Sequence, residues 1–140
     1  MERIVVAAKA GADQPWLADA AAELAQQTGA AVSVVSLDGL DVEALSPTPR
    51  SEFRQLADAT VKSFVERLRA AGVEAEGDVR SGLVVPGVLL YAEERDADVI
   101  VCGGSTKGRL ARRVLGSVPV DLIQRSRRPV LVITPPETGS

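Results

Sequence analysis

The sequence predicts an α/β fold, a doubly wound open sheet of five parallel strands in one domain. Short apolar runs alternate with segments of helical periodicity, in the order β-α-β-α-β-α-β-α-β. Apolar residues make up 46% of the chain and are mainly Ala, Val and Leu, which suits buried strands covered by helices. At 140 residues the chain has the usual length of one domain. The alternation of strands and helices implies right-handed crossovers and a parallel sheet.

The first strand and helix follow from the N-terminal pattern. Arg3–Ala8 is a short apolar run, as expected for a strand buried on both faces. After the loop Lys9–Gln14, Asp13 is a candidate helix cap, and Pro15 suits the first turn. Gly29 supplies a left-handed end to this helix. The helical spacing is carried by Leu17, Ala20, Ala21 and Leu24.

The second strand is expected at Ala31–Leu37, another apolar run. The connection Asp38–Arg50 has no periodic pattern and is long for so small a domain, which suggests a lid or a mobile loop. A long helix opens at Ser51 and ends at Gly72. One stripe of this helix is predicted to consist of Phe53, Leu56, Thr60, Phe64 and Leu68.

The second half of the chain continues the alternation. Val73–Arg80 is charged and alternating, as expected for an edge strand, and Val84–Arg95 is helical by its apolar spacing. Asp98–Cys102 is predicted to be a central strand, with Asp98 at its beginning. A last helix opens at Gly116 or Ser117 and runs through Gln124. The final strand is Pro129–Thr134, so the domain spans residues 1–134 and residues 135–140 form a polar tail.

Composition excludes several classes of function. The chain has no His and a single Cys, Cys102, so an internal disulfide is impossible, and a hydroxyl nucleophile activated by His is excluded. A transition-metal site is not expected either. No apolar stretch approaches the ~20 residues of a membrane span, and no signal-peptide core follows Met1. We therefore expect a cytoplasmic protein with neither a membrane nor a specific nucleic acid as partner.

Positive charge gathers near the C-terminus, although the net charge is −3. One interpretation is a local positive field, which would favour phosphates or the acidic surface of a partner. The alternative is a solvated helix face whose charge is balanced by acids elsewhere in the fold. The basic residues are Lys107, Arg109, Arg112, Arg113, Arg125, Arg127 and Arg128, against the one acid Asp121.

The glycine-rich segment Gly103–Gly108 follows the fourth predicted strand. In open parallel sheets, ligands bind beyond the carboxyl ends of the strands, and loops with glycine let backbone amides approach an anion. The pair Gly116-Ser117 then begins a helix, whose free amides also favour phosphate. The segment is not a P-loop, because Arg109-Leu110 replaces the Lys-Ser or Lys-Thr of that motif.

Several segments resemble the universal stress protein family. The resemblance covers Ala97–Gly103, Gly108, Gly116-Ser117-Val118 and Arg128–Ile133, together with Ile4–Ala8 at the N-terminus. The nucleotide-binding branch of that family has the signature Gly, two residues, Gly, nine residues, then Gly-Ser or Gly-Thr. Gly103, Gly116 and Ser117 are in register with it, whereas Thr106 replaces the middle glycine.

The resemblance implies the strand order 3-2-1-4-5, the adenine nucleotide alpha hydrolase-like arrangement. It also implies an ATP-type site at the carboxyl ends of strands 1 and 4, with magnesium accompanying the nucleotide, and a homodimer formed through Pro129–Thr134. The site residues that it implies are Ala8, Lys9, Leu37, Gly103, Ser105, Thr106, Gly108, Gly116, Ser117 and Val118.

Two departures bear on this site. Lys9 replaces an acid that contacts the nucleotide's sugar in the family, and an ammonium group donates hydrogen bonds but accepts none. Thr106 adds a β-branched side chain where backbone was to approach phosphate. Three interpretations stay open: ATP binds weakly, another nucleotide or anion binds with the help of Lys9, or the pocket is vestigial and the protein acts through dimer and partner contacts.

The sequence favours a stress-response or regulatory protein over an enzyme. Phosphoryl transfer needs a base and an acid that holds magnesium, and the nearby candidates are only Asp13, Asp38 and Asp98. A slow ATPase is the remaining enzymatic alternative, and a nucleotide-free dimeric interaction module is the alternative binding function. Plain structural roles are expected for Cys102 as a buried small hydrophobe, Ser117 as a cap or phosphate contact, Trp16 and Tyr91 as packing residues, and Glu93-Glu94 as a solvated face.

Overall fold

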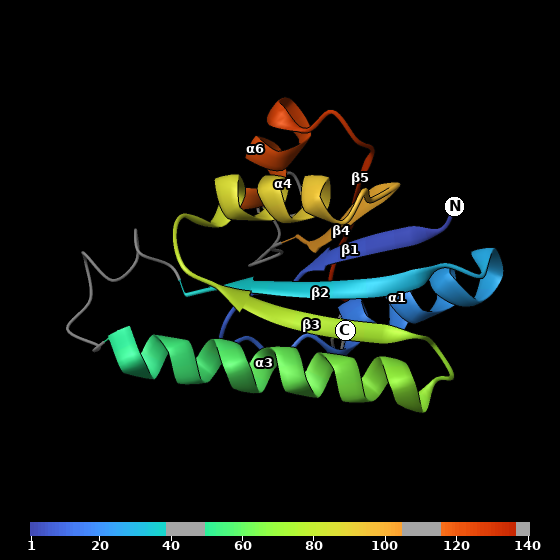
Figure 1. Cartoon of the computed structure of the whole chain (residues 1–140), viewed down its shortest axis with the longest axis horizontal. Coiled ribbons are helices and arrows are strands. Elements are labelled where there is room, and N and C mark those ends of the chain that lie inside the picture. The colour runs from blue at the N-terminus through green and yellow to red at the C-terminus, as the bar shows by residue number, and fades with distance from the viewer. Residues whose placement is uncertain (39–49, 105–115, 137–140) are drawn as a thin grey trace.

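The structure, a computed structural model, describes residues 1–38, 50–104 and 116–136 of the chain. These residues form a sheet with helices on both faces (Figure 1). The elements are β1 (Arg3–Ala7), α1 (Pro15–Thr28), β2 (Ala31–Leu37), α3 (Arg50–Ala70), β3 (Ala75–Arg80), α4 (Val84–Glu94), β4 (Val99–Gly103), α6 (Ser117–Arg125) and β5 (Val130–Ile133). The predicted Asp38–Arg50 connection lies, from 39 to 49, outside the described residues.

The sheet has the order β3-β2-β1-β4-β5, and each neighbouring pair of strands is parallel. The predicted five-stranded parallel sheet, its strand order and the place of β3 at an edge are therefore confirmed. The strand order reverses between β1 and β4, because the chain runs outward from β1 through β2 to β3 on one side and from β4 to β5 on the other. This is the switch point at which parallel sheets usually bind ligands.

Two apolar layers cover the sheet. Helices α1 and α3 lie on one face, and α4 and α6 lie on the other (Figure 1). The strands alternate between the two layers, so that Val6 and Val101 pack toward α1 while Val5 and Ile100 pack toward α4. All four of these side chains are fully buried, which explains why the strands read as nearly continuous apolar runs.

Helix α1 begins differently from the prediction. Gln14 occupies the cap position, but neither its side chain nor that of Asp13 bonds the first amides, so the prediction of Asp13 as the cap is wrong. Pro15 at the first helical position fixes the start without a cap, because its missing N–H needs no partner. The end is as predicted: Gly29 adopts φ 76° and donates its N–H to the carbonyl of Ala25.

Helix α3 packs closely on β2 and β3. Thr60, Phe64 and Leu68 of the predicted stripe are buried, but Leu56 is 45% exposed, so the stripe is wrong at that position. The helix lies against β3 at Gly77, where a Cβ would collide with Val61 and would come within 2.9 Å of Val65 Cγ2. β3 begins at Ala75, later than predicted, because the N–H of Val73 still bonds Leu68 at the end of the helix.

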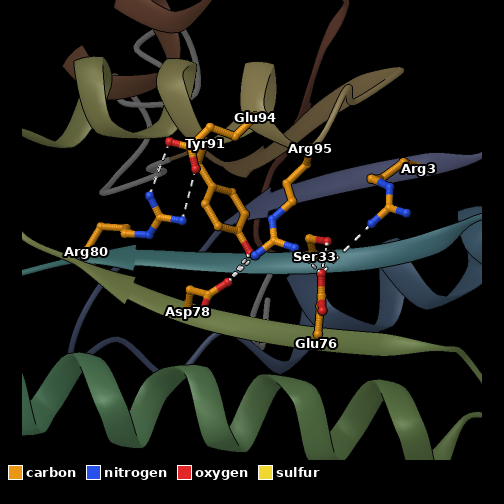
Figure 2. Close-up of polar contacts among 8 residues, drawn as sticks. All are labelled: Arg3, Ser33, Glu76, Asp78, Arg80, Tyr91, Glu94 and Arg95. Carbon is orange, nitrogen blue, oxygen red and sulfur yellow. Dashed lines mark hydrogen bonds and ion pairs between the residues drawn. The ribbon is translucent and has the colours of Figure 1, made fainter.

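A polar network lies between β3 and α4 (Figure 2). The fully buried Tyr91 donates its hydroxyl to Asp78 at 2.8 Å, and both burial and this carboxylate raise the pKa of the phenol. The guanidinium groups of Arg80 and Arg95 lie 5.1 and 4.9 Å from the centre of its ring. Arg95 also bonds Asp78, at 2.7 Å. The remaining members of the network are Arg3, Ser33, Glu76 and Glu94. Tyr91 is thus a packing residue, as predicted.

Candidate functional site

The predicted site residues of three strands meet at the carboxyl end of the sheet. In the register of the sheet, Ala7 lies beside Val35 of β2 and Cys102 of β4. One residue further, Ala8 follows β1 at the level where β4 ends in Gly103, and Leu37 ends β2 on the other side. The carboxyl ends of β2, β1 and β4 therefore form a continuous rim, as seen in Figure 1. Lys9 continues from the middle of this rim.

The predicted site residues differ in exposure. Ala8 and Leu37 are buried, at 6% and 5%, whereas Lys9 and Ser117 are exposed. Val118 is partly buried and packs against the apolar layer of α4. The other predicted members, Ser105, Thr106 and Gly108, lie outside the described residues.

The loop that contains Lys9 is held to α3. The carbonyl of Lys9 accepts from Ala12 N–H at 3.0 Å, which closes a turn. Gly11 takes φ 79° in this turn, and its N–H donates to Thr60 Oγ1 on α3 at 2.9 Å. In the described part of the chain, no acidic side chain forms an ion pair with Lys9. Its ammonium group is thus an available positive charge at the rim.

Gly103 serves a packing role that the sequence did not reveal. A Cβ at this position would lie 2.8 Å from Gln14 Nε2 and 2.9 Å from Trp16 Cη2, closer than real Cβ atoms come. The start of α1 therefore rests directly on the backbone of Gly103. The next amide is also committed, since Gly104 N–H donates to the carbonyl of Ile133 on β5 at 2.8 Å. Glycine is needed at 103 for the fit of α1, whatever ligand approaches the rim.

Helix α6 connects β4 to the parallel strand β5, so the crossover that contains it leaves the sheet at the carboxyl end of β4. Its cap position is Gly116, with φ 98° and ψ 159°, and no side chain caps the first turn. Ser117 is the first helical residue, so the predicted start of this helix is confirmed, and of the two roles expected for Ser117 the cap is wrong while the phosphate contact stays a prediction. The free amides of this turn and the helix dipole favour a negatively charged group.

Of the three candidate acids, Asp98 lies far from the rim, Asp38 directly follows β2, and Asp13 lies exposed in the loop after β1. Asp98 precedes β4 at the opposite end of the sheet, where its Oδ2 accepts from the N–H groups of Glu2 and Arg3 at 2.7 and 3.0 Å. These two backbone bonds lower the pKa of Asp98. Asp38 lies at the end of β2, and its carboxylate accepts from Ser81 Oγ and Gly82 N–H at 2.9 and 3.1 Å. Sequence reasoning missed this role of Asp38, because its partners lie more than 40 residues away.

In the described residues Cys102 is buried, and the side chains that could bind a metal ion are scattered. Cys102 is 2% exposed in the layer under α4, and burial raises the pKa of its thiol to about 11, so it is a buried small hydrophobe as predicted. Among residues 1–38, 50–104 and 116–136, no three His, Cys, Asp or Glu side chains are placed to hold a metal ion. No helix in the described part is long and apolar enough to cross a membrane.

Comparison with known proteins decides the family. The model of the universal stress protein family matches residues 1–134. The chain belongs to the universal stress protein family. The resemblance drawn from Gly103, Gly116-Ser117 and the last strand is therefore confirmed.

Relatives of this universal stress protein include a universal stress protein of Mycobacterium tuberculosis, 33% identical over 113 residues. Those residues are 73% of this chain and 37% of the relative, so the chain spans little more than a third of the curated relatives that it matches first. Two solved structures are similar over 94% of the chain. One is a universal stress protein in complex with cAMP, with 26% identity, 96% of its chain covered and a TM-score of 0.73. The other is from Archaeoglobus fulgidus in complex with dAMP, with 27% identity, 97% covered and a TM-score of 0.73.

Proposed function

We propose that this universal stress protein is a non-catalytic stress-response or regulatory protein that binds an ATP-type nucleotide at the carboxyl ends of β1 and β4. The observation that carries the proposal is the rim itself, where Ala8, Lys9 and Gly103 lie beside one another at the switch point of the sheet. Two similar solved structures are complexes with the adenine nucleotides cAMP and dAMP.

The charges of the rim fit the phosphate part of such a ligand. Lys9 supplies an ammonium group that no acid of the described residues pairs with, and the first turn of α6 supplies amides that no described side chain caps. Both groups donate hydrogen bonds and neither accepts them, so recognition of the phosphates outweighs recognition of the ribose. A magnesium ion would arrive with the phosphates of ATP. The same donor set also fits another nucleotide or a simpler anion.

The nucleotide site can be tested at Gly116. Isothermal titration with ATP and magnesium should give heat with the wild type and none with Gly116→Val, because a β-branched residue is strained at φ 98°. Gly29→Val is the matched control, since Gly29 has φ 76°, nothing within 4 Å of its Cβ position, and lies at the end of α1 remote from the rim. The control should bind ATP like the wild type. Absence of heat from the wild type at millimolar ATP would remove the proposal.

A nucleotide-free, dimeric interaction module is the second candidate, and β5 favours it. This edge strand reads Val-Leu-Val-Ile without a charge, and Leu131 is 40% exposed. The other edge, β3, carries Glu76, Asp78 and Arg80. An apolar edge without charges is the one that pairs with another chain. We infer a homodimer that forms through Pro129–Thr134, whether or not a nucleotide binds.

The dimer has its own test. Leu131→Glu should halve the mass measured by sedimentation equilibrium, because it places a charge on the pairing strand. Leu90→Glu is the control, since Leu90 is 56% exposed on α4 and away from β5. An unchanged mass for Leu131→Glu, or an equal loss in both variants, would count against pairing through β5.

The absence of catalysis and a cytoplasmic location belong to the same proposal. Asp98 is engaged with backbone at the far end of the sheet, and the carboxylate of Asp38 is bonded to Ser81 and Gly82, so we expect neither of them to hold magnesium. Asp13, exposed in the loop after β1, is the third candidate, and one acid without a base does not make a phosphoryl-transfer site. A steady-state phosphate-release assay should therefore give no turnover with ATP. Turnover that Gly116→Val abolishes would establish a slow ATPase instead.

A further inference from the structure

Asp38 fastens the end of β2 to the segment that follows β3. Its backbone N–H donates to the carbonyl of Arg80 at 3.0 Å. Its carboxylate accepts from Ser81 Oγ at 2.9 Å and from Gly82 N–H at 3.1 Å. One residue thus bonds three consecutive positions, and it is only 2% exposed. Gly82 takes φ 125°, a conformation that side chains rarely adopt, so the segment is shaped to bring its amide to the carboxylate.

Ser81 also connects Asp38 to the helix layer that contains α3. Arg54, near the start of α3, donates from Nη1 to Ser81 Oγ at 3.1 Å. The hydroxyl of Ser81 therefore gives its hydrogen to Asp38 and accepts one from Arg54. This clamp of Asp38, Ser81, Gly82 and Arg54 therefore joins the end of β2 to the segment between β3 and α4 and to the start of α3.

The clamp fixes the main chain of Leu37. The side chain of Leu37 points into α4, where a Cβ on Gly87 would lie 2.6 Å from Leu37 Cδ1. Leu37 is 5% exposed, and its side chain is committed to this contact. Any contribution of Leu37 to a ligand at the rim therefore comes from its backbone, and Asp38 sets where that backbone lies.

The strand order decides which part of a nucleotide this backbone faces. The phosphate donors, Lys9 and the start of α6, belong to the β1 side and the β4–β5 side of the rim. β2 lies on the other side of β1. A nucleotide whose phosphates lie between Lys9 and the start of α6 therefore places its nucleoside toward β2.

We propose that Asp38 is a positioning residue for the nucleoside half of the ligand, acting through the clamp on the backbone of Leu37. This inference rests on the nucleotide site proposed above. It predicts that the clamp affects affinity for ATP but not affinity for inorganic triphosphate, which carries the phosphates alone. A residue with only a general structural role would not separate the two ligands.

The experiment is a pair of calorimetric titrations, with magnesium–ATP and with inorganic triphosphate, on the full chain. Asp38→Asn and Ser81→Ala should each weaken ATP binding by about tenfold, the effect of losing a hydrogen bond to a charged group, and leave triphosphate binding unchanged. Ser81→Thr keeps the hydroxyl and should bind ATP like the wild type. Asp98→Asn is the matched control, because Asp98 also accepts two hydrogen bonds that join distant segments, but at the opposite end of the sheet. It should leave both affinities unchanged.

Each result is decisive. Equal weakening of both ligands by Asp38→Asn and Ser81→Ala, or no change in ATP binding, would overturn the role of Asp38 while the nucleotide site stands. A wild type that binds no ATP would overturn the nucleotide site and the positioning role with it. Faster amide hydrogen exchange at Gly82 in Asp38→Asn verifies that the clamp is broken, and it is measured without any ligand. If Asp38→Asn does not fold, Ser81→Ala and Ser81→Thr give the same decision.

Discussion

The packing of α1 on Gly103 predicts that even a single added methyl group is destabilising. In Gly103→Ala the new Cβ would lie 2.8 Å from Gln14 Nε2, 2.9 Å from Trp16 Cη2 and 3.4 Å from Leu17 Cδ2. Ordinary van der Waals contact begins near 3.4 Å, so the first two neighbours must each retreat by about half an ångström. The amide of Gln14 ends a flexible side chain and moves readily. The rigid ring of Trp16 packs against the core, so its displacement carries most of the strain.

The expected cost is about 2 kcal/mol, within the ~1–3 kcal/mol typical of overpacking. It corresponds to a melting temperature lowered by about 6 °C for a domain of this size. Urea unfolding followed by circular dichroism measures the free energy of unfolding, with the slope m as a check on two-state behaviour. A Gly103→Ala variant as stable as the wild type would refute the packing argument.

A double-mutant cycle separates packing from ligand contact. Trp16→Leu removes the ring that the new methyl group meets, so the cost of Gly103→Ala in that background should fall below about 0.5 kcal/mol. If ATP affinity is lost in Gly103→Ala and returns in the double variant, the glycine serves the site through the position of α1. If affinity stays lost while stability returns, the methyl group obstructs the ligand itself.

Three other residues carry further predictions. Ser36 is fully buried, and its Oγ has no hydrogen-bond partner among the residues that the structure describes, so Ser36→Ala should leave the free energy of unfolding unchanged or raise it by up to about 1 kcal/mol in urea unfolding; a clear loss would reveal a hidden partner. Gly77→Ala should cost about 3 kcal/mol in the same assay, because its Cβ meets branched side chains of α3; a cost under 1 kcal/mol would show that α3 shifts freely. The lowered pKa of Asp98 stabilises the fold above its unfolded pKa, and this contribution is lost as pH falls through the folded value. Asp98→Asn should therefore reduce stability at pH 7 more than at pH 3, and an equal difference at both would contradict the assignment.

The strand pattern was predictable because burial on two faces leaves a local signal. Runs such as Ala31–Leu37 read as apolar, and their alternation with helices admits few topologies. The place of the candidate site was inferred from the rule that parallel sheets bind ligands at the carboxyl ends of their strands, and it stays a prediction. The cap of α1 was missed because Asp13 is the better capping residue as a local signal, whereas the helix starts at Pro15 with Gln14 before it and no side-chain cap.

The contacts that shape the rim were not predictable, since they join residues far apart in the chain. Gly103 fitted a phosphate-approach motif and also a packing requirement, and only its distance to Trp16 reveals the second. Asp38 carried no signal beyond being an acid after a strand. Its partner Ser81 lies 43 residues on, and no local periodicity or spacing connects the two.

The contrast between the two sheet edges limits how this protein assembles. At β3, Glu76, Asp78 and Arg80 are bound into the network around Tyr91 (Figure 2), so a strand that docked there would face a row of fixed charges. At β5 the strand is short and apolar, and Leu131 is exposed. If one edge accepted the other, copies would add head to tail without limit. In the homodimer proposed above, β5 would meet its own copy, and a two-fold contact of that kind closes on itself. The charged network of β3 would then favour a dimer that stops at two chains over an open filament.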